Sequence, residues 1–238
     1  NGPAYFAPLG ALSVNFNTVA VVVGPGESKG APGAVGVETP VDLIEIANEV
    51  TTSSRGARKR FSVEREVSSK TGKVTFEVSG AVPMGTDPVK MYRAVSLPRV
   101  YFMQVFESLM KQRGIEVTGK FRAGKSPKGA RILSRMDSDT LPIILARMNK
   151  FSSNFMAEHV LKSVGAEVDG APGTTDKRLD AIKEYLESLG NDVSDLELVN
   201  GSGLSRDIRL RPSHITSVLI DMFHDRRLGP EFVSSLAI

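Results

Sequence analysis

The 238-residue sequence contains no cysteine, which excludes disulfide bonds and metal ions held by thiolates. It also lacks a long apolar run, since the longest, Val19 to Val23, is far shorter than the ~18 residues of a membrane-spanning helix. No initiator Met, basic segment or apolar segment of a signal peptide opens the sequence, so we expect a mature chain or one that begins partway along a longer protein. The net charge of +3 permits an anionic partner without indicating one.

The composition that is present, 41% hydrophobic and 24% charged residues, is typical of a globular protein with one or two domains. The sequence changes character near residue 96. Strand-forming residues with Gly and Pro between them precede this point, and helical patterns follow it. We therefore expect an α/β (α+β) protein in which residues 1–96 form a mainly β-rich domain and residues 97–238 form an α-rich region.

The expected strands occupy the first part of the chain. Residues 12–17 and 18–23 are rich in strand-forming side chains, and a long loop with five glycines and two prolines follows over residues 24–36. Residues 42–51 carry apolar side chains at every second position, which favours a strand, although periodicity alone leaves a short helix open. Residues 61–67 and 74–78 alternate apolar and polar side chains and predict a hairpin.

Helix start and stop signals are frequent after Ser96. Six helices are expected: one from Pro98 to Gly114, one that begins after Asp139-Thr140, one from Asn154 to Gly165, one from Asp176 to Leu189, one that starts at Ser213 and one that starts at Gly229-Pro230.

Two short stretches match catalytic or nucleotide-binding motifs, but the sequence around each argues against that function. Lys70-Thr71-Gly72 is the tripeptide that holds substrate in penicillin-binding proteins and serine β-lactamases, but it falls in the expected hairpin turn, which favours a structural role. Gly119 to Ser126 fits the phosphate-loop pattern G-x-x-x-x-G-K-S. That pattern needs a helix from its Lys onward, and Gly129 and the strand-like residues 130–133 argue against one. Nucleotide hydrolysis is a distant alternative.

Solvent exposure explains the clusters of charged residues without a binding site. Arg55 to Arg60 and Lys120 to Arg135 are basic but lack the interleaved aromatic residues of single-stranded nucleic-acid sites, so we expect solvated loops and no nucleic-acid partner. Asp221, His224 and Asp225 share a helical segment and predict a solvent-exposed face. No metal or other cofactor is expected.

The segment from Arg147 to His159 is the most informative. One helix ends, a short polar loop follows, and another helix begins at Asn154, so Ser152 and Asn154 can project from one exposed corner. On the residues alone, Ser152 or Ser153 is a helix N-cap. However, Asn-Lys-x-Ser-x-Asn followed by Ala-Glu resembles the S-x-N motif of the class C penicillin-binding proteins, the D-alanyl-D-alanine carboxypeptidase/endopeptidase family.

The resemblance extends over nearly the whole chain. Residues 7–17 are similar to the segment leading into the inserted domains of the family, and residues 78–83 and 114–117 look like its later sheet and the return to the catalytic domain. Residues 200–206, Asn-Gly-Ser-Gly-Leu-Ser-Arg, resemble a family loop that usually begins with Asp, so Asn200 is a departure. The resemblance implies part of a penicillin-recognising transpeptidase/β-lactamase-like domain with an inserted β-rich domain.

The resemblance also implies an acyl-transfer mechanism. A nucleophilic Ser in S-x-x-K, activated by its Lys, attacks the peptide carbonyl between two D-alanines, and K-T-G holds the carboxylate end. Carried over by position, Ser152 relays a proton towards the leaving amine and Asn154 orients the substrate. The implied partners are peptidoglycan stem peptides, with β-lactams as covalent inhibitors of the full-length protein, and the implied location is periplasmic or exported.

The other two motifs of the mechanism are not found at suitable places. The one S-x-x-K match, Ser108 to Lys111, lies deep inside an expected helix rather than at its amino end. We therefore expect the nucleophile and the catalytic K-T-G to lie outside residues 1–238, and the chain to be a fragment that is inactive alone. The alternative is a non-catalytic module of the same fold that binds peptidoglycan or a protein partner.

Overall fold

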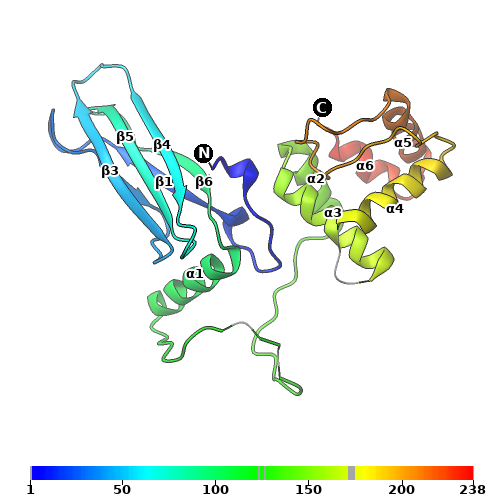
Figure 1. Cartoon of the computed structure of the whole chain (residues 1–238), viewed down its shortest axis with the longest axis horizontal. Coiled ribbons are helices and arrows are strands. Elements are labelled where there is room, and N and C mark those ends of the chain that lie inside the picture. The colour runs from blue at the N-terminus through cyan, green and yellow to red at the C-terminus, as the bar shows by residue number, and fades with distance from the viewer. Residues whose placement is uncertain (1, 123, 126, 171–174, 238) are drawn as a thin grey trace. The chain divides into compact units, whose positions relative to one another are not determined.

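The structure is a computed structural model that describes residues 2–122, 124–125, 127–170 and 175–237 (Figure 1). By its internal contacts the chain divides into two compact units, residues 1–126 and 127–238, and each is described by itself. The first unit holds the described strands and one long helix, and the second holds the remaining described α-helices. None of the described helices combines the length and apolarity that a membrane span requires.

The first unit contains two sheets of three strands. The strands are β1 (Thr18–Gly24), β2 (Ala34–Val37), β3 (Ile44–Ser53), β4 (Arg60–Val67), β5 (Val74–Pro83) and β6 (Val89–Ala94). One sheet has the order β2-β1-β6 and is antiparallel. The other has the order β3-β5-β4, in which β3 runs parallel and β4 antiparallel to β5.

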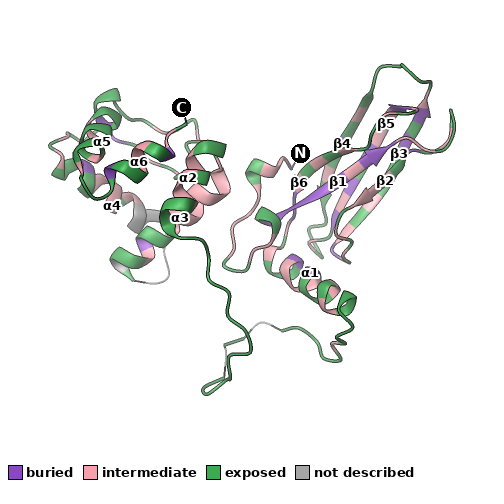
Figure 2. Ribbon diagram, turned by 180° about the vertical axis from the view of Figure 1, so that it is seen from behind, coloured by how far each residue is buried: buried purple, intermediate pink, exposed green. Residues whose placement is uncertain are grey.

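Both sheets contribute to one hydrophobic core. In β5 the alternate residues Val74, Phe76 and Val78 are all 0% exposed, because successive side chains of a strand point to opposite faces. Buried residues also run along β1 (Figure 2). Helix α1 (Pro98–Gln112) joins the same core through Tyr101 and Val105, so it is part of this unit and fixed to it.

The second unit is helical. Its α-helices are α2 (Leu141–Phe151), α3 (Asn154–Asp169), α4 (Thr175–Ser188), α5 (Pro212–His224) and α6 (Gly229–Ser235). Helix α3 packs against α4, and α6 packs against both α2 and α5. Between α4 and α5 the chain is closed by a bridge in which Glu197 and Arg209 exchange backbone N–H···O bonds of 2.9 Å. This bridge sets the base of the 200–206 loop.

Most of the expected elements are confirmed. Residues 61–67 and 74–78 lie in the antiparallel strands β4 and β5, and residues 42–51 lie largely in β3. Lys70-Thr71-Gly72 occupies the turn, where Gly72 has a φ of 69°. The helices expected at Pro98, Leu141, Asn154 and Gly229 begin at those residues.

Four local expectations are wrong. Residues 12–17 form no strand, because Asn15, Phe16 and Asn17 all have positive φ, and the Asn17 side chain donates to the Pro8 carbonyl (2.8 Å) and the Ser13 hydroxyl (3.1 Å) to hold the turn. The 24–36 segment is not all loop, since β2 begins at Ala34 and pairs with β1.

The third error concerns a helix end. Gly165 does not end α3, which continues to Asp169, because a Gly inside a helix costs only about 1 kcal/mol and packing can offset it. Helix α5 also begins one residue before the expected Ser213 cap: Arg211 is its N-cap, and the buried His214 accepts from the Arg211 N–H at 3.3 Å.

Candidate active site

The corner between α2 and α3 is only two residues long. Helix α2 ends at Phe151 and α3 begins at Asn154, so Ser152 and Ser153 make the whole connection. Ser152 has φ 50° and ψ 49°, which is the left-handed region that non-glycine residues rarely occupy. Its N–H donates to the Asn149 carbonyl (3.3 Å), and the Ser153 N–H donates to the Met148 carbonyl (3.0 Å). This pair of bonds is the usual closure of a helix by a left-handed residue, which is most often Gly.

The two serines have different tasks. The Ser153 hydroxyl accepts from the Met156 N–H at 3.3 Å, so Ser153 is the N-cap of α3. Ser152 is thus not needed as the N-cap of α3, and its side chain is exposed. Asn154 is the first residue of α3 and is half-buried. Within the described parts of the chain, no hydrogen bond engages the Ser152 hydroxyl or the Asn154 side-chain amide, which leaves both able to meet a substrate.

The end of α2 is fastened to the C-terminal segment just before this corner. The Asn149 amide donates to the hydroxyl of Ser235 at 2.8 Å, and the Lys150 ammonium donates to the Leu236 carbonyl at 2.5 Å. Ser235 is buried, so its bond is shielded from water. These contacts hold the backbone on the α2 side of Ser152.

A residue to which the sequence assigned no role, Glu158, connects α3 to the 200–206 loop. One carboxylate oxygen of Glu158 accepts from the backbone N–H groups of Gly201 and Ser202, both at 3.0 Å, and from the Ser202 hydroxyl at 2.8 Å. The Asn200 side chain accepts from the Gly203 N–H at 3.1 Å and closes the turn. One sequence signal could have pointed to Glu158: it belongs to the Ala-Glu pair that follows the S-x-N motif, and it lies four residues after Asn154.

The other candidate motifs of the mechanism lie in the first unit. Ser108 is half-buried in the third turn of α1, not at its amino end, and Lys111 is exposed. The Lys70-Thr71-Gly72 turn is internally bonded: the Gly72 N–H donates to the Ser68 carbonyl at 2.8 Å, and the Gly72 carbonyl accepts from the Ser96 hydroxyl. Neither lies in the helical unit that carries Ser152 and Asn154.

Among the described residues, no observation supports a metal site or a nucleotide-binding loop. No group of three or more metal-binding side chains occurs among the residues that the structure describes. Asp221 instead accepts from the Tyr185 hydroxyl at 2.6 Å; desolvation, followed by this bond, raises the pKa of Tyr185 to about 12. The expected phosphate-loop match includes residues 123 and 126, which lie outside the described residues, and the described remainder of Gly119 to Lys125 contains no helix.

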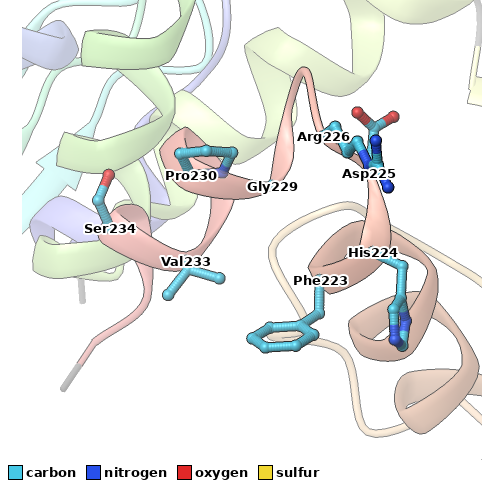
Figure 3. A pocket seen from close by; sticks show the side chains of 8 residues that line it. All are labelled: Phe223, His224, Asp225, Arg226, Gly229, Pro230, Val233 and Ser234. Carbon is cyan, nitrogen blue, oxygen red and sulfur yellow. The ribbon is translucent and has the colours of Figure 1, made fainter.

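A hollow of about 450 Å³ lies between α5 and α6 (Figure 3). Its lining combines Phe223, Pro230 and Val233 with the polar side chains of His224 and Arg226. The His224 imidazole is bonded to the Ile220 carbonyl of its own helix at 2.9 Å. Ser152 and Asn154 do not line this hollow, so it is separate from the S-x-N corner.

Known proteins resemble this chain over most of its length. A D-alanyl-D-alanine carboxypeptidase from Actinomadura sp. (strain R39) is 34% identical over 216 residues, which cover 85% of this chain and 38% of the relative. The D-alanyl-D-alanine carboxypeptidase DacB of Haemophilus influenzae is 28% identical over 144 residues, covering 60% of this chain and 30% of the relative. The aligned segments thus cover less than two fifths of the length of either relative.

Solved structures support the same fold. The crystal structure of penicillin binding protein 4 (dacB) from Haemophilus influenzae matches with a TM-score of 0.77 at 20% identity, over 98% of this chain and 51% of that one. Its complex with a β-lactam matches with a TM-score of 0.75. Residues 2–238 match the model of the D-Ala-D-Ala carboxypeptidase 3 (S13) family. By this match, which spans nearly the entire sequence, the chain belongs to the D-Ala-D-Ala carboxypeptidase 3 (S13) family.

Proposed function

We propose that the chain supplies the S-x-N part of an acyl-transfer site that acts on the D-alanyl-D-alanine ends of peptidoglycan stem peptides. The observation that carries this proposal is the corner itself: Ser152, the serine of the S-x-N tripeptide, adopts a φ of 50°, where Gly would be less strained. Backbone strain of this kind concentrates at functional sites. The backbone of Ser152 closes α2, but N-capping of α3 does not account for its side chain, because Ser153 is that cap.

The proposed roles follow from what each side chain can do. The exposed Ser152 hydroxyl can accept and donate a proton, so it relays one towards the leaving amine of the substrate. The Asn154 side chain carries both a donor and an acceptor and orients the substrate amide. Its place at the start of α3, directly after the rigid corner, keeps the two groups at a fixed spacing.

We further propose that the nucleophile and the carboxylate-binding tripeptide are supplied by polypeptide outside residues 1–238, so that the chain alone forms no acyl-enzyme. Two local observations support this. Ser108 lies well inside α1 rather than at its amino end, and Lys70-Thr71-Gly72 is committed to a hairpin turn. The open apolar face of α5 also favours further covering polypeptide, with Ile220 54% and Phe223 69% exposed.

The remaining proposals concern the domains and the setting. The β-rich residues 1–96 correspond to a domain inserted into the transpeptidase-like domain, and residues 97–238 carry the S-x-N part of it, although α1 within that range packs on the β-rich core. β-Lactams acylate the complete protein as substrate mimics, and a peptidoglycan substrate requires an exported or periplasmic location.

Intact-mass measurement after incubation with penicillin tests the proposal. We expect a covalent adduct on a polypeptide extended at both ends to the length of the relatives, and none on the 238-residue chain. Acylation of the 238-residue chain would overturn the assignment of the nucleophile and make Ser108 the candidate. If neither polypeptide reacts, a non-catalytic peptidoglycan-binding or protein-binding module replaces the enzyme, and the α5–α6 hollow becomes its first candidate surface.

A further inference from the structure

We propose that Glu158 is the positioning residue of the Ser152–Asn154 corner, acting by holding the 200–206 loop against the face of α3 on which Asn154 lies. The proposal deepens the proposed function and rests on it for its catalytic consequence. Its structural part, the coupling between the loop and Asn154, can be tested whether or not acyl transfer occurs.

The carboxylate of Glu158 is a strong anchor for the loop. Three donors, the Gly201 N–H, the Ser202 N–H and the Ser202 hydroxyl, converge on one oxygen at 2.8 to 3.0 Å. Hydrogen bonds to an ionised carboxylate are stronger than bonds between neutral groups. The loop is also closed at its base by the backbone pair of Glu197 and Arg209. It is therefore held at its base by its own chain and at its turn by α3.

The loop lies close along α3. A Cβ atom on Gly201 would come within 2.9 Å of the Leu161 side chain and 3.3 Å of the Ala157 carbonyl, so any larger residue here would have to displace its neighbours on α3. Leu161 is buried beneath the loop. Asn154 and Glu158 are four residues apart and share one face of the helix. Gly201 and Ser202 thus lie against α3 at Glu158, one helical turn after Asn154.

Loss of the contact between the 200–206 loop and α3 would disturb the corner without removing a group that contacts substrate. Asn154 is the first residue of α3, and because helix ends are the parts of a helix most prone to fraying, neighbouring contacts decide how well its side chain is fixed. Displacement of a positioning contact by about 1 Å can reduce a rate by on the order of 100-fold. We therefore expect Glu158→Ala to lower the rate of acylation by roughly that factor while Ser152 and Asn154 remain in place.

The first experiment measures the coupling by NMR in the 238-residue chain. Glu158→Ala should lower the hydrogen-exchange protection of the Gly201 and Ser202 amides about tenfold or more and shift the Asn154 side-chain amide resonances. Glu158→Gln keeps an acceptor oxygen and should restore most of both signals. Glu167→Ala, on the same helix and exposed, is the matched control and should change neither. Unchanged loop amides, or a mobile loop with unchanged Asn154 resonances, would overturn the proposal.

The second experiment measures penicillin acylation in the polypeptide extended to the length of the relatives. Glu158→Ala should slow acylation strongly, Glu158→Gln should recover most of the rate, and Glu167→Ala should match the wild type. A mobile loop with an unchanged acylation rate would reduce Glu158 to a loop anchor and overturn its positioning role. If the wild type itself is not acylated, the proposed function fails, whereas the NMR result still decides whether Glu158 couples the loop to Asn154. Should Glu158→Ala fail to fold, Ser202→Ala, which removes one of the three donors to Glu158, replaces it in both measurements and should give smaller losses of the same sign, whereas wild-type values in both would overturn the proposal.

Discussion

Ser152 adopts a conformation that a serine holds only at a cost. A residue with a side chain in the left-handed region is less stable by about 1–2 kcal/mol, and Gly avoids this penalty but loses more entropy on folding. We expect Ser152→Gly to raise the free energy of unfolding by about 0.5 kcal/mol, as the difference between these effects. Urea denaturation followed by circular dichroism measures it, and a clear loss of stability would show that the Ser152 side chain stabilises the corner.

Ser153 provides the contrasting case at the next position. Its hydroxyl caps α3 by accepting from the Met156 N–H, so Ser153→Ala should lower the free energy of unfolding by about 1 kcal/mol. Thermal denaturation of the 238-residue chain measures the loss. Ser153→Asp restores an acceptor and is expected to recover most of it. If Ser153→Ala and wild type unfold alike, the cap does not contribute to the stability of α3.

At the scale of elements, the pairing of β4 with β5 depends on Gly80. Its φ is 119°, and a Cβ there would lie 2.4 Å from the Arg60 carbonyl oxygen and 2.7 Å from the Phe61 Cα. Because these are backbone atoms of the paired strand, Gly80→Ala should lower the free energy of unfolding by about 2–4 kcal/mol.

Gly36 in β2 is the matched control for this substitution. It is also a strand glycine, but no atom lies within 4 Å of its added Cβ, so Gly36→Ala should change stability by less than about 1 kcal/mol. Chemical denaturation of both variants compares them. Equal losses would mean that the cost arises from the glycine composition of the strands and not from the close approach of β4.

The contact between α4 and α5 predicts a dependence on alkaline pH. Tyr185 donates to Asp221, and desolvation together with this bond raises its pKa to about 12, from about 10 in an unfolded chain. Its contribution to stability is therefore present below pH 10 and is lost as the pH rises towards 12. The effect should be small, because Tyr185 is 39% exposed.

Thermal melts of wild type and Tyr185→Phe between pH 9 and 12 measure this dependence. The melting temperature of the wild type should fall more steeply over the upper part of that range. Tyr92→Phe, an exposed position in β6 of the other unit, is the control and should follow the wild type. Parallel curves for wild type and Tyr185→Phe would contradict the role of the bond to Asp221.

Local sequence patterns correctly predicted the elements that are marked by signals between residues close together in the sequence. The β4–β5 hairpin has alternating side chains and a Gly at a positive φ in its turn, and α1 begins with Pro98 at its first position. The left-handed turn at Asn15 to Asn17 was missed, because the contacts of Asn17 with Pro8 and Ser13 are not visible as a period or a turn signal. Gly165 misled for the converse reason, since the packing of α3 against α4 overrides its low helix propensity.

At the scale of the whole molecule, the sequence predicted the S-x-N corner but not what supports it. A short motif between two helical patterns predicted that Ser152 and Asn154 lie at a corner. In the structure Ser152 lies in the two-residue connection between α2 and α3, and Asn154 is the first residue of α3. Glu158 binds a loop more than forty residues away, and no local pattern predicts such a contact. Side chains that act through long-range hydrogen bonds are therefore the part of the site that only the fold reveals.

The two units differ in how much apolar surface they bury, which predicts unequal stability. In the first unit, thirteen buried residues form one cluster. Among the described residues of the second unit, the buried apolar side chains are Leu161, Leu186 and Leu196, while Phe223 is 69% exposed. Because burial of apolar surface is the main stabilising contribution, the helical unit should unfold at a lower urea concentration than the β-rich unit.

Hydrogen exchange followed by mass spectrometry across a urea series separates the two transitions. Leu186→Ala should lower the stability of the helical unit alone by about 2–4 kcal/mol, and Phe76→Ala that of the β-rich unit alone by about 3–5 kcal/mol. A single transition in which both variants shift all peptides together would show that the units fold cooperatively. Separate transitions would mean that the S-x-N corner belongs to the less stable unit, so its geometry depends on anchors such as Glu158 more than on a large core.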